Sequence, residues 1–419
     1  MTSTAVTDGS TSALSLVVQK FGGTSVADPD RIRAVADHVS RTRRDGHDVV
    51  VVVSAMGKTT DELIRLAHDV CPEPAGREMD MLLTAGERIS MALLCMAIET
   101  EGVPAASFTG SQAGIVTDTT HGKARILEVR GDRLREAVSN GQVAVVAGFQ
   151  GVSTERDVTT LGRGGSDTTA VALAAVLKAE VCEIYTDVAG VYTADPRVVP
   201  NARRLPAVSY EEMQEMAATG GRVLALRSVE FARNHGVVLH VRSSFTWEQG
   251  TWVNEEGPME QAIISGVTHD TSEAKVTVAH VPDQPGIAAR LFGALAEDDV
   301  NVDMIVQNTS TGGTTDISFT VPRADLAAAM RVSESLGPEI GAESVTHDAE
   351  IGRVSIVGAG MKTNPGVAAR MFRVLSSECV NIEMISTSSI RISCVVRARD
   401  VERAVKALHA EFELDKPLT

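Results

Sequence analysis

The first half of the chain alternates short apolar runs with segments in which apolar residues recur every three or four positions. Residues 49–53 form a continuous β-branched run, which is typical of a strand buried on both faces of a sheet. Comparable runs predict strands at 16–18, 143–147 and 181–185, and helical periodicity predicts helices at 78–101 and 168–179. This βαβ alternation predicts a three-layer α/β domain with a mainly parallel sheet over residues 15–245.

A helix is predicted directly after the first strand. Asp28 precedes Pro29, which fits an N-cap followed by the first helical position. Gly46 marks the expected end of this helix. Its apolar face is formed by residues at helical spacing: Ile32, Val35 and Val39.

The second half contains an internal repeat. The sequences KVTV (275–278) and PGIAARLF (285–292) correspond to RVSI (353–356) and PGVAARMF (365–372). An offset of 80 then continues through VNVDMI (300–305) and VNIEMI (380–385), so chance similarity of two βα units is a poor explanation. The pattern predicts two α+β modules of βαββαβ type, at 273–345 and 350–412.

Two segments lack such periodicity. Residues 1–14 are rich in Ser and Thr and are predicted to be a disordered leader. Residues 246–272, which include WEQG at 247–250 and EEGP at 255–258, are predicted to be a linker.

Composition narrows the class of protein. The 419 residues are enough for two to four domains, and aromatic residues are only 3%, so the core must consist of Val, Ala, Leu and Ile. A net charge of −16 argues against nucleic acid or an anionic membrane as partner. Anionic substrates can then bind only where basic side chains, backbone N–H groups or a metal reverse the local field.

The cysteines and the N-terminus indicate a cytoplasmic protein. Five cysteines occur without a CxxC pair, which argues against a disulfide framework or a zinc site. A secretory signal begins with a positively charged region, whereas the first 19 residues contain neither Lys nor Arg. The longest apolar runs are too short to span a bilayer.

Two glycine-rich segments carry candidate phosphate chemistry. In KFGGTS (20–25) a strand delivers Lys20 and then two glycines, whose backbone N–H groups can approach phosphate oxygens; a structural turn is the alternative. In TTLGRGGSDTT (159–169) Arg163 stands among three glycines before an Ala-rich helix. Its guanidinium can grip a carboxylate in a two-point fork, and an ordinary N-cap is the alternative.

Two further segments are less specific. LTAGER (83–88) contains Glu87, which is either functional or a solvated helical charge. The segment 185–197 follows a predicted strand and carries Asp187, Tyr192 and Arg197. Ligands bind at the carboxyl ends of strands in open α/β sheets, which favours a ligand-binding role for this segment.

Together these segments resemble the aspartate kinases of the amino-acid kinase family. The resemblance rests on VQKFGGTS (18–25), VSAMG (53–57), LLTAGER (82–88), GFQG (148–151), LGRGGSD (161–167) and 186–197. The repeat is similar to the paired ACT modules of that family, and the closest pattern is the monofunctional actinobacterial type. The resemblance implies transfer of a phosphoryl group from ATP, with Mg²⁺, to the side-chain carboxylate of L-aspartate. The product would be 4-phospho-L-aspartate, the first intermediate towards lysine, threonine and methionine through diaminopimelate.

The resemblance also assigns residues to the site, with no dedicated metal ligands. Catalytic roles fall to Lys20, Arg163 and Asp167. The aspartate site comprises Ser54, Thr60, Glu87, Arg163, Gly164, Gly165 and Ser166. The nucleotide site comprises Lys20, Phe21, Gly22, Gly23, Thr186, Asp187, Tyr192, Arg197, Arg222 and Val223. A carboxylate nucleophile is already ionised at neutral pH, so no general base is required.

Regulation is the expected role of the repeat. By the resemblance, lysine, threonine or both bind between ACT modules, across a subunit interface of a homo-oligomer. An α₂β₂ assembly is also possible, with a separate regulatory subunit that starts at Met259. The effector residues implied are Asp283, Gly286, Asn301, Val302, Asp303, Gln307, Gly366, Asn381, Ile382 and Ser388. Ser389 and Asn364 depart from the family pattern and bear on effector specificity.

Three alternatives remain open from the sequence. Asp303 and Glu383 could be solvated turn acids in modules that only dimerise. The chain could phosphorylate another acidic amino acid, such as glutamate or acetylglutamate. It could also be an amino-acid sensor with a weak kinase half, although the joint presence of four residues argues against this: Lys20, Glu87, Arg163 and Asp187.

Overall fold

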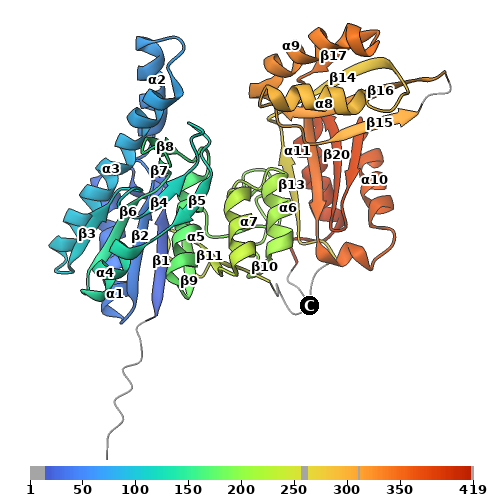
Figure 1. Cartoon of the computed structure of the whole chain (residues 1–419). Coiled ribbons are helices and arrows are strands. Elements are labelled where there is room, and N and C mark those ends of the chain that lie inside the picture. The colour runs from blue at the N-terminus through green and yellow to red at the C-terminus, as the bar shows by residue number, and fades with distance from the viewer. Residues whose placement is uncertain (1–14, 256–262, 310–311, 417–419) are drawn as a thin grey trace, which may run out of the picture. The chain divides into compact units, whose positions relative to one another are not determined.

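The computed structural model describes residues 15–255, 263–309 and 312–416, and these residues form two compact units (Figure 1). The first unit comprises the chain up to Val191 together with Pro206–Gln214 and Arg222–Pro258. The second unit comprises Tyr192–Leu205, Glu215–Gly221 and the chain from Met259 onward.

An eight-stranded sheet forms the centre of the first unit, in the order β10-β12-β11-β9-β1-β2-β6-β3. All neighbouring strands are parallel except β11 and β12. The strands are β1 (Leu16–Phe21), β2 (Asp48–Val53), β3 (Ala105–Phe108), β6 (Val143–Ala147), β9 (Val181–Thr186), β10 (Ala207–Ser209), β11 (Leu239–Ser243) and β12 (Thr251–Asn254). The predicted parallel α/β architecture is thereby confirmed.

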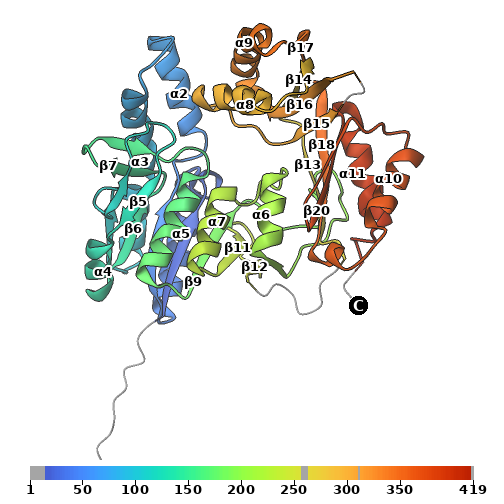
Figure 2. The same ribbon diagram turned by 45° about the vertical axis from the view of Figure 1, so that its right-hand side comes forward.

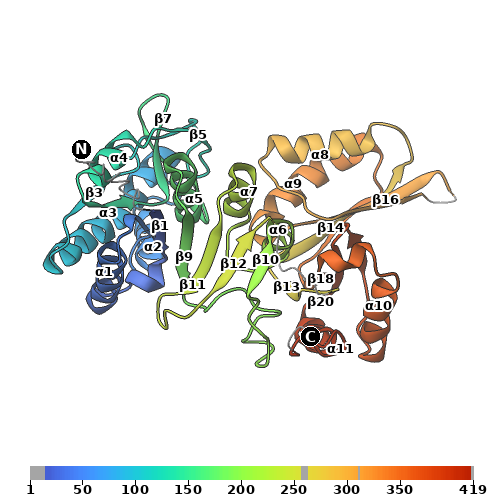
Figure 3. The same cartoon turned by 90° about the horizontal axis from the view of Figure 1, so that it is seen from below.

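Helices cover both faces of this sheet. On one face α1 (Pro29–Arg44) and α3 (Gly76–Thr100) pack on each other and on β2. On the other face α5 (Gly165–Leu177) packs on β1, β2 and β9, and α7 (Leu226–His235) lies beside it (Figure 3). The remaining helices are α2 (Thr59–Val70), α4 (Asp132–Ser139) and α6 (Tyr210–Ala218), and η1 (Gly23–Val26) is a 3₁₀ turn.

Local signals in the sequence explain several of these elements. Asp28 caps α1, since its side chain accepts a hydrogen bond from the Arg31 N–H at 2.9 Å, and Pro29 begins the helix as predicted. Every residue from Val49 to Val53 is fully buried, as expected for a central strand. A small sheet in the order β5-β4-β7-β8 was not predicted. Its strands are β4 (Ile115–Thr117), β5 (Ile126–Val129), β7 (Gln150–Ser153) and β8 (Val158–Thr160).

The second unit contains the two predicted modules. In the first module a four-stranded antiparallel sheet, in the order β15-β16-β14-β17, has two helices on one face (Figure 2). Its elements are β14 (Glu273–Pro282), α8 (Ile287–Glu297), β15 (Ile305–Thr309), β16 (Thr314–Pro322), α9 (Leu326–Leu336) and β17 (Ser344–Asp348). Short 3₁₀ turns are η2 (Arg323–Asp325) and η3 (Gly337–Ile340).

The second module differs from the predicted βαββαβ order. It contains β18 (Ile351–Val357), η4 (Ala359–Lys362), α10 (Val367–Ser377), β19 (Met384–Thr387), β20 (Arg391–Arg397), η5 (Ala398–Asp400) and α11 (Val401–Glu411). Its fourth strand is β13 (Gly266–Asp270), which precedes the first module in the chain and pairs antiparallel with β18. Because β17 pairs antiparallel with β14 in the same way, β13 takes the place that β17 has in the first module.

The range 246–272, predicted to be a linker, therefore contains two strands. β12 belongs to the large sheet and β13 to the second module, while residues 256–262 between them lie outside the described part of the chain. Gly250 is required where the chain turns into β12, because an added Cβ would lie 1.6 Å from the Val241 carbonyl oxygen. The predicted leader, residues 1–14, also lies outside the described residues.

One helix of the described chain, α3, is long and apolar enough by length and composition to cross a membrane. Half of its most apolar stretch is buried inside the protein, where it packs on α1, β3 and β6. Its buried residues include Asp80 and Glu87. These observations describe a core helix of the first unit.

Candidate active site

Three neighbouring strands of the large sheet end at the same edge. β1 lies between β2 and β9 and is parallel to both, so the loops that follow Phe21, Val53 and Thr186 emerge side by side. The Ser54 N–H donates to the Phe21 carbonyl at 3.1 Å, and the Gly22 N–H donates to the Tyr185 carbonyl at 3.2 Å. Carboxyl ends of parallel strands are the usual place for a ligand site.

The glycine pair after β1 is fixed by backbone contacts. The Gly57 N–H donates to the Gly23 carbonyl at 3.0 Å, and a Cβ on Gly23 would lie 2.9 Å from the Ala55 carbonyl oxygen. The Gly22 N–H is committed to β9. Gly23 opens the turn η1, and a first-turn amide has no acceptor within its own helix. Gly23 is therefore the better placed of the two to receive a phosphate oxygen.

Lys20 lies on β1 and reaches the first turn of α5. Its Nζ is 2.6 Å from Oδ1 of Asp167, and the two side chains are only 11% and 12% exposed. The register places Lys20 beside Val52 and Ile184, in the middle of the three strands. The structure thus brings together two of the predicted catalytic residues, in a largely desolvated ion pair.

Arg163 stands in the loop that leads into α5. Gly162 and Gly164 on either side have φ values of +76° and +72°, which favour glycine. A Cβ on Gly164 would also lie 2.2 Å from Cβ of Ala225. Arg163 itself is exposed and has no hydrogen-bond or ion-pair partner among the residues that the structure describes. Its guanidinium is consequently available to a ligand.

Glu87 lies on α3 and faces the loop after β2. It is 3% exposed, and its Oε1 accepts a hydrogen bond from the Ala55 N–H at 3.2 Å. Burial raises the pKa of Glu87 to about 7, against the opposing effect of the Ala55 hydrogen bond. Its Oε2 is buried and has no partner within the described chain. An unpartnered carboxylate oxygen of this kind suits a cationic ligand group.

The helix α3 approaches this loop closely. A Cβ on Gly86 would lie 2.7 Å from Cβ of Ala55, and the Ser90 hydroxyl donates to the Ser54 carbonyl at 2.7 Å. Thr59, which precedes the predicted substrate residue Thr60, lies beside the same position on α3, 3.6 Å from where that Cβ would be. Ser54 and Thr60 are both half-buried.

The residues predicted for the nucleotide fall on both compact units. Thr186 ends β9, and its hydroxyl donates to Oδ1 of Asp187 at 3.1 Å. Arg222 and Val223 precede α7 in the first unit. Tyr192 and Arg197 belong to Tyr192–Leu205 in the second unit. There Arg197 binds both carboxylate oxygens of Asp195, at 2.7 to 3.1 Å.

Most of the predicted effector residues lie on turns and edge strands of the two modules. Gly286 and Gly366 precede α8 and α10 with φ values of +100° and +96°, so the repeat produces the same left-handed turn twice. The other residues of the set are exposed or half-buried: Asp283, Asn301, Val302, Asp303, Gln307, Asn381, Ile382 and Ser388.

Two of these effector residues already have partners in the chain. Asp303 forms an ion pair with Arg353 of the second module, and Ser388 donates to Glu215 at 2.6 Å. Glu383 accepts from Lys275 of the first module, so neither module acid is simply solvated.

Sequence reasoning missed several residues that contact the site. Ser25 and Ser244 join the loop after β1 to β11 through a 2.8 Å hydrogen bond between their hydroxyls. Gly86, which lies in the motif LLTAGER, and Ser90, two residues beyond that motif, contact the loop after β2. In the modules, Lys275 and Arg353 stand at matching places of the repeat, which was a usable signal.

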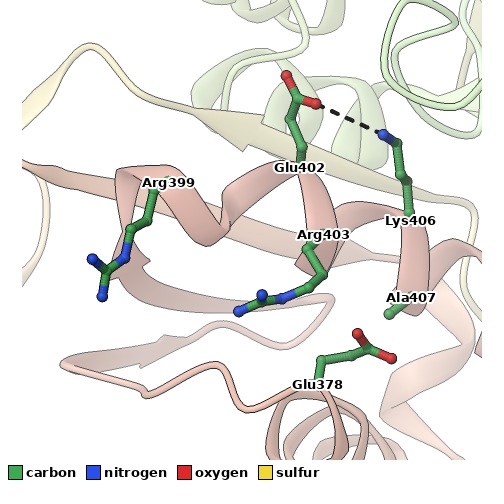
Figure 4. A pocket seen from close by; sticks show the side chains of 6 residues that line it. All are labelled: Glu378, Arg399, Glu402, Arg403, Lys406 and Ala407. Carbon is green, nitrogen blue, oxygen red and sulfur yellow. Dashed lines mark ion pairs between the residues drawn. The ribbon is translucent and has the colours of Figure 1, made fainter.

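A hollow of about 610 Å³ on the second module is lined by charged residues but by none of the predicted site residues (Figure 4). Lys406 pairs with Glu402 at 3.7 Å, and Arg403 pairs with Asp400 at 2.7 Å. These charges neutralise one another along one helix face. In residues 15–255, 263–309 and 312–416, no three His, Cys, Asp or Glu side chains cluster as a metal site.

Comparison with known families accounts for both units. Residues 15–243 match the amino acid kinase family, and residues 276–335 and 354–412 each match the ACT domain. The aspartokinase of Mycolicibacterium smegmatis is 58% identical over 407 residues, which are 96% of this chain and 97% of that protein.

Solved structures agree with this result. E. coli aspartokinase III in complex with aspartate and ADP (R-state) is 26% identical, with a TM-score of 0.83, and the match covers 94% of this chain and 99% of that one. The same enzyme in complex with lysine and aspartate (T-state) is 27% identical, with a TM-score of 0.72, over 95% and 99%. The chain belongs to the amino acid kinase family, as an aspartokinase whose kinase domain is followed by two ACT domains.

Proposed function

We propose that the chain transfers the γ-phosphoryl group of ATP to the side-chain carboxylate of L-aspartate, through the residues grouped at the end of β1, β2 and β9. The observation that carries this proposal is the presence of two opposite charges beside one sheet edge. Glu87 on α3 faces the loop after β2 with a buried unpartnered oxygen, and Lys20 on β1 is held by Asp167 of α5. An amino acid substrate needs an acceptor for its ammonium, and a transferring phosphoryl group needs a cation.

Aspartate binding follows from the charges. Glu87 accepts the substrate ammonium, and the exposed guanidinium of Arg163 takes the α-carboxylate in a two-point fork. Ser54, Thr60 and the backbone of Gly164, Gly165 and Ser166 complete the aspartate site. The β-carboxylate then attacks the γ-phosphorus without a general base, because it is ionised at neutral pH. The bond from the γ-phosphorus to the β,γ-bridging oxygen breaks, and ADP leaves with the electron pair.

Lys20 supplies the positive charge at the phosphoryl group. Asp167 neutralises and orients its ammonium before the nucleotide arrives, and Lys20 then shifts towards the phosphate oxygens. Gly23 and the N-terminus of η1 offer amide N–H groups to the phosphates. When bound with ATP, Mg²⁺ would neutralise charge on the phosphates, and no residue of the described chain is proposed as a dedicated ligand for it.

The remaining parts of the proposal concern nucleotide binding, regulation and location. Six residues bind the nucleotide beyond the phosphates: Thr186, Asp187, Tyr192, Arg197, Arg222 and Val223. Lysine, threonine or both bind at the ACT modules and inhibit, in a homo-oligomer or an α₂β₂ assembly whose regulatory subunit starts at Met259. A cytoplasmic location is supported by five free cysteines, three of them buried.

Lys20→Ala tests the proposed chemistry. We expect the wild type to form an acyl phosphate from aspartate, trapped as a hydroxamate by hydroxylamine, and to form much less with glutamate. Lys20→Ala should fold and lose roughly 10²- to 10³-fold in turnover, since it removes a preorganised charge. Asp167→Asn, which keeps the lysine charge, should lose less. Turnover of Lys20→Ala near the wild-type value would refute the role of Lys20.

Arg163→Lys tests aspartate recognition. Lysine keeps the charge but not the planar fork, so KM for aspartate should rise by roughly tenfold or more, the usual range for a charged hydrogen bond. KM for ATP should stay unchanged. Arg44→Lys, an exposed arginine at the end of α1, is the control. An effect on ATP alone would move Arg163 to the nucleotide site.

The raised pKa of Glu87 predicts that aspartate turnover depends on pH. With its pKa at about 7, Glu87 is neutral below this pH and ionised above it, and only the ionised form attracts the substrate ammonium. We expect kcat/KM for aspartate to rise by roughly tenfold between pH 6 and pH 8, as the ionised fraction of one such group does. Glu87→Gln should raise KM and flatten the profile. A slope that persists in Glu87→Gln would assign the titration to another group.

Regulation can be tested with amino acids alone and in combination. Lysine, threonine or both should inhibit the wild type, because each module offers a Pro-Gly turn and polar groups to a zwitterion. Asp283→Ala and Gln307→Ala should weaken inhibition while leaving uninhibited turnover intact. If calorimetry detects neither amino acid bound to the wild type at millimolar concentration, the effector assignment fails.

A further inference from the structure

The two ACT modules of one chain exchange charges at equivalent positions of the repeat. Lys275 and Arg353 occupy matching places in the first strand of each module, and Asp303 and Glu383 are 80 residues apart. Lys275 Nζ lies 2.5 Å from Glu383 Oε2, and Arg353 forms an ion pair with Asp303. The cation of each module thus binds the acid of the other.

A small apolar cluster lies between the same elements. Met304 and Met384, also 80 residues apart, pack with Ile351 and Val395, and all four are buried. The cluster and the two ion pairs hold the modules together in an approximately two-fold manner. Arg353 is the most deeply buried of the four charges, with a side chain 1% exposed, against 10% for Glu383, 21% for Lys275 and 39% for Asp303. Loss of an acidic partner of Arg353 is therefore costlier than loss of Lys275, because an uncompensated buried charge is strongly destabilising.

The two ion pairs differ in what else they contact. Glu383 is also bound by Arg397 at 2.8 Å, within the second module. Arg353 is 2% exposed, binds Glu273 of the first module at 2.8 Å, and donates from Nη2 to the carbonyl of Ala218 at 2.9 Å. Ala218 is the last residue of α6, where a cation is favourable to the helix dipole.

The end of α6 is held by further contacts to the second module. Glu215 binds Arg391 at 3.0 Å, and the Thr219 hydroxyl is 2.6 Å from that of Thr268 on β13. Gly220 has a φ of +104°, and an added Cβ would lie 1.9 Å from the His269 carbonyl oxygen. The turn that directly follows α6 therefore lies against β13 (Figure 1). The chain continues from Gly221 directly into Arg222 and Val223.

We propose that Arg353 is a positioning residue that couples the arrangement of the two ACT modules to nucleotide binding. Its guanidinium holds the end of α6 while Glu273 and Asp303 of the first module hold the guanidinium. A shift of the first module relative to the second withdraws these acids, and the segment before Arg222 loses its support. The inference rests on the proposed placement of Arg222 and Val223 in the nucleotide site.

The test compares two variants of the full-length chain. Asp303→Asn removes an inter-module charge from Arg353, and within the described residues Asp303 forms no ion pair or hydrogen bond with α6. Lys275→Met breaks the equivalent pair, whose acid is Glu383 of the second module. We expect Asp303→Asn to raise KM for ATP by about fivefold or more, the lower end of common coupling between sites, with kcat and KM for aspartate little changed. Lys275→Met should leave all three at wild-type values.

Hydrogen exchange gives a second readout that does not depend on activity. Amides of 219–223 should exchange faster in Asp303→Asn and in Glu273→Gln than in the wild type, and not in Lys275→Met. The proposal would be overturned if Asp303→Asn and Lys275→Met changed KM for ATP and hydrogen exchange equally. It would also be overturned if neither variant changed either quantity. A wild type without aspartate-dependent phosphoryl transfer would instead contradict the proposed function, which separates the two failures.

Discussion

The parallel pairing of β1 with both β2 and β9 determines where Lys20 lies and brings the loops after these three strands together. Lys20 faces Val52 on one side and Ile184 on the other, so two ladders fix its position along the sheet. A slip of one residue would turn the lysine to the opposite face, away from α5 and Asp167. The same pairing places the glycine turn against the loop after β2, where Gly23 leaves no room for a side chain.

Two charged groups of this site, those of Lys20 and Glu87, are largely buried, which strengthens their electrostatic interactions. The protein carries a net charge of −16, yet its substrates are an acidic amino acid and a nucleotide. Lys20 is nearly withdrawn from solvent with a carboxylate as partner, and Glu87 is buried with one oxygen unpaired. Electrostatic interactions are stronger in such surroundings than in water, so a few groups can oppose the overall charge.

Duplication has produced two modules that share a turn geometry and differ in their contacts. Gly286 and Gly366 adopt the same left-handed conformation at the start of matching helices. The second module, however, takes its fourth strand from β13, and the end of α6 lies on that strand. Arg353 consequently contacts a segment that leads into Arg222 and Val223, while the equivalent Lys275 forms its ion pair with Glu383 of the other module.

The sequence by itself determined the features that depend on local pattern. Features that depend on residues close together in the chain could be predicted from the sequence. They are the valine run of β2, the cap and proline of α1, the two βα units of the repeat and the glycine loops around Lys20 and Arg163. The sequence predicted that Lys20, Asp167 and Glu87 belong to the site. It did not predict the contact between Lys20 and Asp167 or the orientation of Glu87.

Tertiary structure decided everything that joins distant segments. β13 was taken for part of a linker because its partner β18 lies beyond an entire module, and strand pairing over such a distance leaves no periodic trace in the sequence. Asp303 was predicted to bind an effector, with a solvated turn acid as the alternative, and its ion pair with Arg353, fifty residues further along the chain, was not predicted. The burial of a side chain and the partner of a buried charge depend on which segments pack together in the folded chain. A local sequence pattern does not encode this packing.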